Sequence, residues 1–67
     1  MVGFALGGSA VAVRRDGGFV QLLDAATGRL VRTVDLGPWT DRVVLSPDGR
    51  TAAAVGAGGV AFVRLDG

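Results

Sequence analysis

Residues 45–67 read LSPDGRTAAAVGAGGVAFVRLDG and carry the strongest structural signal in the chain: a tight turn, an apolar run, a glycine turn and a second apolar run. Ser46-Pro47-Asp48-Gly49 has proline, aspartate and glycine at its second, third and fourth positions, which suits a type I turn with Ser46 as an acceptor. The apolar runs at residues 52–55 and 60–65 have the length of short strands. The stretch therefore predicts a strand-turn-strand unit.

The same pattern occurs once upstream. GGFVQLLD at residues 17–24 corresponds to GGVAFVRLD at 58–66, and SAVAVRRDGG at 9–18 corresponds to TAAAVGAGG at 51–59. Gly18 maps to Gly59 at an offset of 41 residues, and Asp24 maps to Asp66 at an offset of 42. Repeats of about 40 to 45 residues with four strands each are the period of β-propeller blades. Chance similarity between two glycine- and alanine-rich stretches is the alternative interpretation.

Strand and turn signals cover the whole chain and predict an all-β protein with antiparallel sheets. Asp16-Gly17 is a favoured hairpin pair, and the side chain of Asp24 can accept hydrogen bonds from the backbone two or three residues further on. No segment has ten or more residues at helical spacing. The expected strands are residues 4–6, 10–13, 19–23, 30–36, 42–45, 52–55 and 60–65.

Apolar residues occupy consecutive rather than alternate positions in most of these strands. Both faces of such a strand need cover, and sheets stacked face to face, as in propeller blades, provide it. The strand at residues 30–36 differs, since it is predicted to be an outer, half-exposed strand. In that strand we expect one face to carry Leu30, Arg32, Val34 and Leu36.

The composition excludes several kinds of chemistry. The 67 residues can form one small domain at most, and seven Arg against six Asp leave a net charge of +1, which is not the footprint of a nucleic-acid-binding protein. His, Cys, Lys, Glu and Tyr are absent, so disulfides and zinc sites with Cys or His ligands are excluded. Asp, Ser, Thr and Arg alone remain for catalysis. We therefore expect no enzyme, no cofactor and no metal site.

Three further signals concern membranes and nucleotides. No apolar run is long enough to span a bilayer, and residues 1–10 lack the basic residues that begin a signal peptide. The glycine-rich residues 56–59 precede a strand rather than a helix, so they do not predict a phosphate cradle. We expect a cytoplasmic protein with no membrane partner.

The residues resemble WD40-type β-propeller repeats and the related bacterial YVTN repeats. In such repeats a strand leads into Ser-Pro-Asp-Gly, as at residues 46–49, and a third strand ends in Trp-Asp before a turn that is similar to residues 24–29. Leu23-Asp24 and Leu65-Asp66 stand in place of Trp-Asp, and Gly37-Pro38 stands in place of Gly-His. The resemblance therefore points to propeller repeats in general more than to WD40 repeats proper.

This resemblance covers nearly the whole chain and implies about one and a half blades. Residues 1–36 would supply most of one blade, and residues 37–67 would supply the first three strands of the next. The implied function is a noncatalytic protein-interaction scaffold whose partners are another protein, further blades of the same propeller or copies of itself. Two alternatives are a fragment of a larger propeller-containing enzyme or signalling protein, and a self-assembling structural blade unit.

The propeller interpretation also predicts where a partner would bind. The turns at residues 14–18 and 56–59 and the connection that contains Trp39 should emerge on one rim, and the turns at 24–28 and 46–49 on the other. Tryptophan is enriched at interface hot spots, although Trp39 could instead pack over an adjacent blade, and paired arginines at a turn are usually solvated. The candidate partner-binding residues are Arg14, Arg15, Asp16, Trp39, Asp41 and Arg42.

Overall fold

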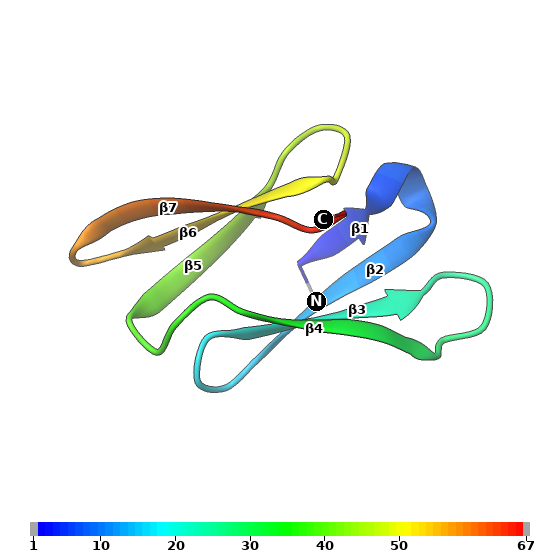
Figure 1. Ribbon diagram of the computed structural model, residues 1–67, viewed down its shortest axis with the longest axis horizontal. Coiled ribbons are helices and arrows are strands. Elements are labelled where there is room, and N and C mark those ends of the chain that lie inside the picture. Colours follow the sequence, from blue (N-terminus) through cyan, green and yellow to red (C-terminus); the bar gives the residue numbers. More distant parts are fainter. Residues whose placement is uncertain (1, 67) are drawn as a thin grey trace.

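The computed structural model describes residues 2–66, which contain seven β-strands and one short 3-10 turn (Figure 1). The expected all-β class is confirmed. Met1 and Gly67, the first and last residues of the two expected blade segments, lie outside the described residues. The elements are β1 (Gly3–Ala5), η1 (Leu6–Gly8), β2 (Ala10–Arg15), β3 (Phe19–Asp24), β4 (Leu30–Asp35), β5 (Thr40–Leu45), β6 (Thr51–Gly56) and β7 (Gly59–Arg64).

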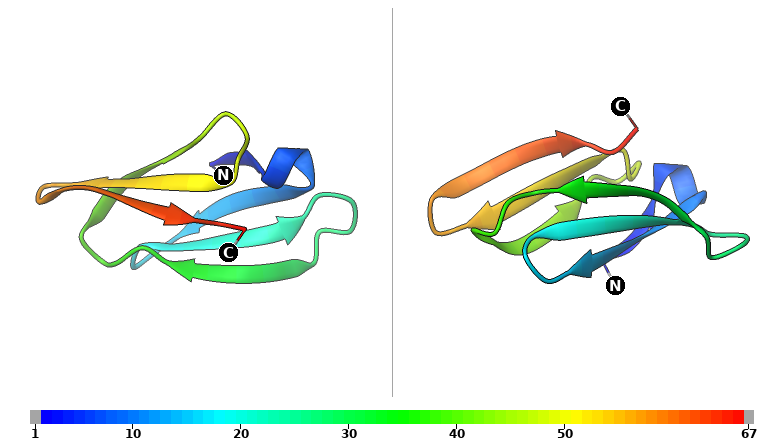
Figure 2. Two further views of the ribbon diagram at one scale, coloured as in Figure 1. Left: turned by 45° about the horizontal axis from the view of Figure 1, so that its top comes forward. Right: turned by 60° about the horizontal axis from the view of Figure 1, so that its bottom comes forward.

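The strands form two antiparallel sheets, each of which follows the order of the chain. One sheet has the order β1-β2-β3-β4 and the other has the order β5-β6-β7. Figure 2 shows the two sheets as layers, with β5, β6 and β7 on one side and β2, β3 and β4 on the other. Each sheet therefore presents one face to the other sheet and one face outward.

Local hydrogen bonds account for the turns that join the strands. The Asp24 carboxylate accepts hydrogen bonds from the backbone N–H groups of Ala26, at 2.8 Å, and Thr27, at 3.1 Å, as the sequence predicts. In the predicted Ser-Pro-Asp-Gly turn, the N–H of Gly49 donates to the carbonyl oxygen of Ser46 at 2.9 Å. These turns are set by residues close together in the chain, which is why sequence patterns find them.

Leu36 and Leu65, which were expected in strands, directly follow the ends of β4 and β7, and two other leucines depart further from the prediction. Leu6 was expected in the first strand, but β1 ends at Ala5 because the N–H of Leu6 donates to the carbonyl oxygen of Gly49 instead of to a neighbouring strand. Leu30 was expected to share a face with Arg32. A β-bulge pairs Leu30 with Leu23, next to the pair of Arg32 with Leu22, and so moves Leu30 to the opposite face of the sheet.

Small apolar side chains fill the space between the two sheets. The buried residues include Ala12 on β2 and Ala52 and Ala54 on β6, all with no exposed surface. Without long side chains the backbones approach closely: a methyl group added at Gly49 would lie 2.6 Å from the Cα of Ala5. Within residues 2–66 the buried apolar side chains are Ala5, Ala10, Ala12, Val20, Leu22, Val34, Leu36, Ala52, Ala54 and Leu65.

Hydrogen bonds join the two sheets at both of their edges. Besides the Leu6 to Gly49 hydrogen bond, the N–H of Gly7 donates to the carbonyl oxygen of Asp48 at 2.9 Å. At the far edge, Nη1 of Arg32 on β4 donates to the carbonyl oxygen of Leu65, just after β7, at 2.9 Å. β1 therefore lies against the β5–β6 turn and β4 lies against the end of β7, so the two meanders stack in the same strand order. No helix among residues 2–66 is long and apolar enough to cross a membrane.

Candidate functional site

Two connections meet at one end of the stacked sheets. The N–H of Leu36 donates to the carbonyl oxygen of Gly18 at 2.9 Å. The two backbone segments are so close there that a side chain at Gly18 would overlap the carbonyl group of Gly37. This contact brings the β2–β3 turn beside the β4–β5 connection. Between them lies a hollow of about 470 Å³, which we call the rim hollow and which is lined by Arg14, Arg15, Asp16, Gly17, Gly18, Pro38 and Thr40.

Arg14 ties the two sheets together at this end. Its Nη1 donates to the carbonyl oxygen of Asp41 at 2.6 Å and its Nη2 donates to that of Thr40 at 2.7 Å. Thr40 is itself buried, and its hydroxyl donates to the carbonyl oxygen of Leu36 at 3.1 Å. The guanidinium group of Arg14 is therefore already used within the fold, which favours a structural role for this candidate residue.

Arg15 and Asp16 are more accessible to a partner than Arg14. Both residues are exposed, and both line the rim hollow. Nε of Arg15 donates to the side-chain oxygen of Gln21 at 2.9 Å, which holds the arginine along the outer face of the four-stranded sheet. The pair presents a positive and a negative charge side by side at the edge of the hollow.

Trp39 is at once packed and open to solvent. Its indole ring lies against two glycines: a methyl group at Gly56 would come within 2.5 Å of Cε3, and one at Gly37 would come within 2.5 Å of Nε1. The side chain nevertheless keeps 43% of its surface exposed. Trp39 therefore joins the β4–β5 connection to the end of β6 and still offers one side of the ring to a partner.

Asp41 and Arg42 are exposed on β5 but do not line the rim hollow. Asp41 sits at a bulge, since the neighbouring pairs are Thr40 with Gly56 and Arg42 with Val55. Arg42 shares a face with Val55, and that face points away from the other sheet. The structure therefore brings Arg14, Arg15, Asp16 and Trp39 to one end of the fold and leaves Arg42 on a separate surface. A partner-binding role for these candidate residues remains a prediction.

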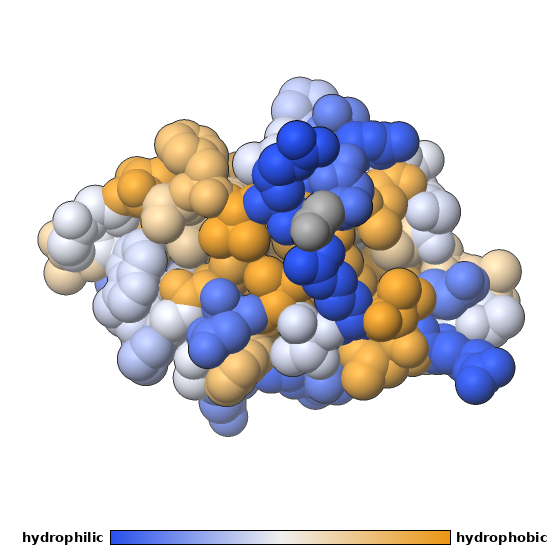
Figure 3. Space-filling model, in the orientation of Figure 1, coloured by the Kyte–Doolittle hydropathy of each residue, from blue (hydrophilic) through white to orange (hydrophobic). Residues whose placement is uncertain are grey.

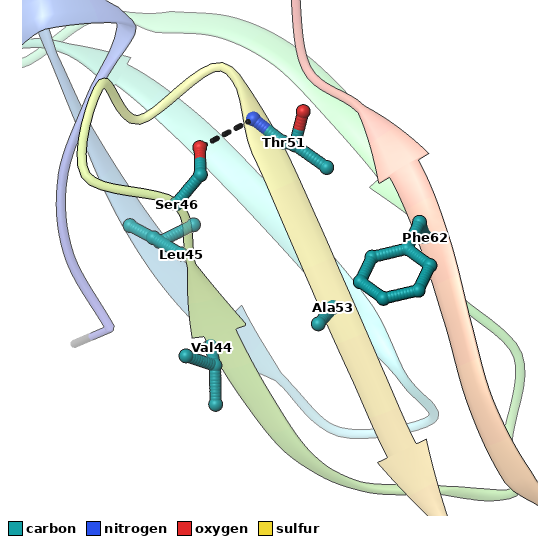
Figure 4. A pocket seen from close by; sticks show the side chains of 6 residues that line it. All are labelled: Val44, Leu45, Ser46, Thr51, Ala53 and Phe62. Atoms are coloured by element: carbon teal, nitrogen blue, oxygen red, sulfur yellow. Dashed lines mark hydrogen bonds between the residues drawn. The ribbon is translucent and has the colours of Figure 1, made fainter.

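A second hollow lies on the outer face of the β5–β7 sheet, and the sequence analysis did not single it out. It measures about 220 Å³ and is lined by Val44, Leu45, Ser46, Thr51, Ala53 and Phe62. Figure 4 shows Val44, Ala53 and Phe62 side by side on three neighbouring strands, with the ring of Phe62 leaning toward Ala53. The signal in the sequence was the run of consecutive apolar residues, which indicated that both faces of these strands need cover.

Four carboxylates have structural partners in the fold: those of Asp24, Asp35, Asp48 and Asp66. The hydroxyl of Ser46 donates to the Asp48 carboxylate at 2.6 Å, and this bond, with a second from the N–H of Arg50 at 3.0 Å, lowers the pKa of Asp48. Asp48 lies at the end of the fold opposite the rim hollow. Within residues 2–66, no group of three or more metal-ligating side chains comes together.

Comparisons with protein-family models, with curated proteins and with solved structures find no match to this chain. A functional assignment therefore depends on its own residues and geometry.

Proposed function

We propose that this chain is a β-propeller segment of the WD40-like kind, about one and a half blades, and that it serves as a noncatalytic scaffold for protein recognition. The observation that carries this proposal is the stacking of two antiparallel meanders in the same strand order, β1 against the β5–β6 turn and β4 against the end of β7. Such stacking is what consecutive propeller blades require.

The chemistry at the rim hollow favours a peptide or a loop as the ligand. Arg15 and Asp16 line the hollow and offer opposite charges. Trp39 does not line it, but it lies in the chain between the lining residues Pro38 and Thr40 and offers a flat apolar surface that is 43% exposed. An aromatic anchor beside charged groups that hydrogen-bond a partner is typical of protein interfaces. A nucleic acid or another polyanion is a poorer fit, since Asp16 offsets Arg15 and Arg14 is bound to backbone carbonyl groups.

The proposal of a noncatalytic role rests on the side chains at the rim hollow. General acid-base catalysis needs a group whose pKa lies near the working pH, and the chain has no His, Cys, Lys, Glu or Tyr to supply one. Asp16, the single acid that lines the hollow, sits in a turn beside Arg15. Binding is therefore the activity that this surface supports best.

Selection of a displayed peptide library against the folded chain tests the proposal. Peptides that bind at the rim hollow should lose at least about tenfold in affinity against Trp39→Ala and against the double variant Arg15→Ala with Asp16→Ala, since buried aromatic anchors carry much of the energy of an interface. Arg29→Ala is the matched control, because Arg29 is exposed at the opposite end of the same sheet. Equal losses in all three variants, or no selected peptide at all, would contradict the proposal.

A further inference from the structure

The two sheets are two versions of one module, and their strand registers correspond residue by residue. Because β1 lies against the β5–β6 turn and β4 lies against the end of β7, the strands of the two sheets stack in the same order, and we match them by position: β2 begins 41 residues before β6, and β3 begins 40 residues before β7. The sequence repeat, which aligns Gly18 with Gly59 and Asp24 with Asp66, is displaced from this match by one or two residues in β3 and β7. The pair of Ala12 with Leu22 in the first sheet corresponds to the pair of Ala53 with Phe62 in the second. Corresponding pairs should therefore show which face of each sheet is equivalent to which.

These corresponding pairs lie in opposite environments. Ala12 and Leu22 have no exposed surface and lie between the sheets, whereas Phe62 is 75% exposed and points outward with Ala53. The face that the first sheet buries is thus the face that the second sheet leaves open.

The reverse correspondence holds for the other face. Ala52 is buried between the sheets and Val63 packs against the same core, while their counterparts Val11 and Leu23 form a pair on the outer face of the four-stranded sheet. The sheets therefore stack front to back. We call the outer face of the β5–β7 sheet the front face (Val44, Ala53, Val60 and Phe62) and the outer face of the four-stranded sheet the back face (Phe4, Val11, Leu23 and Leu30).

Both of these outer faces expose apolar residues, and charged or polar residues border them: Arg42 and Arg64 on the front face, and Arg15 and Gln21 on the back face. On the front face Val44 is 50% exposed and Val60 55%, and on the back face Phe4 is 67% exposed and Leu30 56%. Figure 3 shows apolar residues, in orange, at the surface of the molecule beside hydrophilic ones, in blue. Contiguous exposed apolar faces on a small chain mark interaction surfaces.

We propose that the front face of one chain binds the back face of a second copy of the same chain. The contact inside the chain is already of this kind. The buried face of the four-stranded sheet corresponds to the front face, and it packs against the buried face of the β5–β7 sheet, which corresponds to the back face. Inside the chain, Ala52 and Val63 belong to the same core as Ala12 and Leu22. In the assembly, Val11 and Leu23 of the second copy take the corresponding place beside Ala53 and Phe62. Such a head-to-tail contact closes into a ring or continues as an open stack, according to the rotation between copies.

The contact between copies is weaker than the contact inside the chain. Val55 occupies the position that corresponds to Arg14, so the two hydrogen bonds of Arg14 have no counterpart on the front face. Strand spacings make a three-stranded face of six-residue strands about 14 by 20 Å in extent, which is small beside the roughly 800 Å² per partner of a standard interface. Association should therefore depend strongly on concentration.

Single-face variants and their mixture test the proposal by sedimentation velocity. Phe62→Asp disables the front face and Phe4→Asp disables the back face, and both side chains are largely exposed, so folding should survive. The wild-type chain should associate as its concentration rises from micromolar to submillimolar. Each variant alone should associate about ten- to a hundredfold more weakly, because a charge replaces a buried phenyl ring.

The mixture separates head-to-tail contact from every other mode. Phe4→Asp keeps an intact front face and Phe62→Asp keeps an intact back face, so an equimolar mixture should give a heterodimer of twice the 6.7 kDa of one chain and nothing larger. Ala57→Asp adds the same charge at an exposed turn and should associate like the wild type. Val44→Asp reports on the front face independently if Phe62→Asp loses its β-sheet circular dichroism.

Three results would overturn the proposal: a wild-type chain that stays monomeric at every concentration, a front-face variant that associates normally, or a mixture that does not form the heterodimer. None of these readouts involves the rim hollow. Failure of the head-to-tail contact is therefore distinguishable from failure of peptide binding at Trp39.

Discussion

Replacing Gly49 by alanine tests how the two sheets are held together. Gly49 lies in the β5–β6 turn with φ of +70°, and its carbonyl oxygen accepts a hydrogen bond from the N–H of Leu6 in the other sheet. A methyl group there would lie 2.6 Å from the Cα of Ala5 and 2.7 Å from the backbone nitrogen of Leu6. Both contacts are with backbone atoms, so the sheets must move apart to accept the change.

The expected loss of stability combines two contributions. A residue with a Cβ in the left-handed region costs about 1–2 kcal/mol, and overpacking against backbone that cannot easily shift costs about 1–3 kcal/mol more. We therefore expect Gly49→Ala to lower the free energy of unfolding by about 2–5 kcal/mol. A chain of this size has roughly 3–10 kcal/mol of stability in total, so the loss is a large share of it and would unfold a chain at the lower end of that range.

Gly28→Ala is the matched control. Gly28 has φ of +76°, nearly the same as Gly49, but an added methyl group there meets no atom within 4 Å. It should lose the backbone contribution of about 1–2 kcal/mol and nothing more. Urea unfolding followed by circular dichroism measures both variants. If Gly49→Ala costs no more than Gly28→Ala, the β5–β6 turn does not pack against β1 as described, and the reasoning is refuted.

Two further predictions concern polar contacts at the two ends of the fold. Arg14→Ala removes the hydrogen bonds to the carbonyl oxygens of Thr40 and Asp41 and should lower the free energy of unfolding by about 1 kcal/mol after allowance for solvent screening. Arg15→Ala should lower it by less than half of that amount. Urea unfolding compares the two variants, and equal losses would contradict the structural role of Arg14. Since hydrogen bonds lower the pKa of Asp48, its contribution to stability is present above its unfolded pKa of about 3.9 and is lost as pH falls through the lower folded value. Asp48→Asn should therefore weaken the dependence of the urea midpoint on pH in this acid range, and an unchanged dependence would contradict the prediction.

Much of the local structure could be predicted because its causes are close together in the chain. Asp24 forms its turn with backbone groups two and three residues away, and Ser46 and Gly49 close theirs across three residues. Such bonds depend on residue type and spacing alone. The candidate rim residues were predicted for the same reason, because turns at one end of antiparallel strands emerge together.

Positions that depend on distant contacts could not be predicted in this way. Leu6 leaves its strand because of a hydrogen bond to Gly49, and Leu30 changes face because of a bulge opposite β3. Arg14 gives up its freedom to bind a partner through contacts 26 and 27 residues away. In each case the decisive partner is remote in the chain, and no local pattern marks it.

Residue types and spacing were enough to predict an all-β chain, the positions of its turns, and apolar strands that need cover on both faces. The tertiary structure alone decided which face is covered. Ala12 and Ala53 occupy corresponding positions in strands of similar sequence, yet one is buried and the other lies beside an exposed Phe62. The physical reason is that burial depends on which sheet stacks on which side, and consecutive apolar residues make both sides equally suitable.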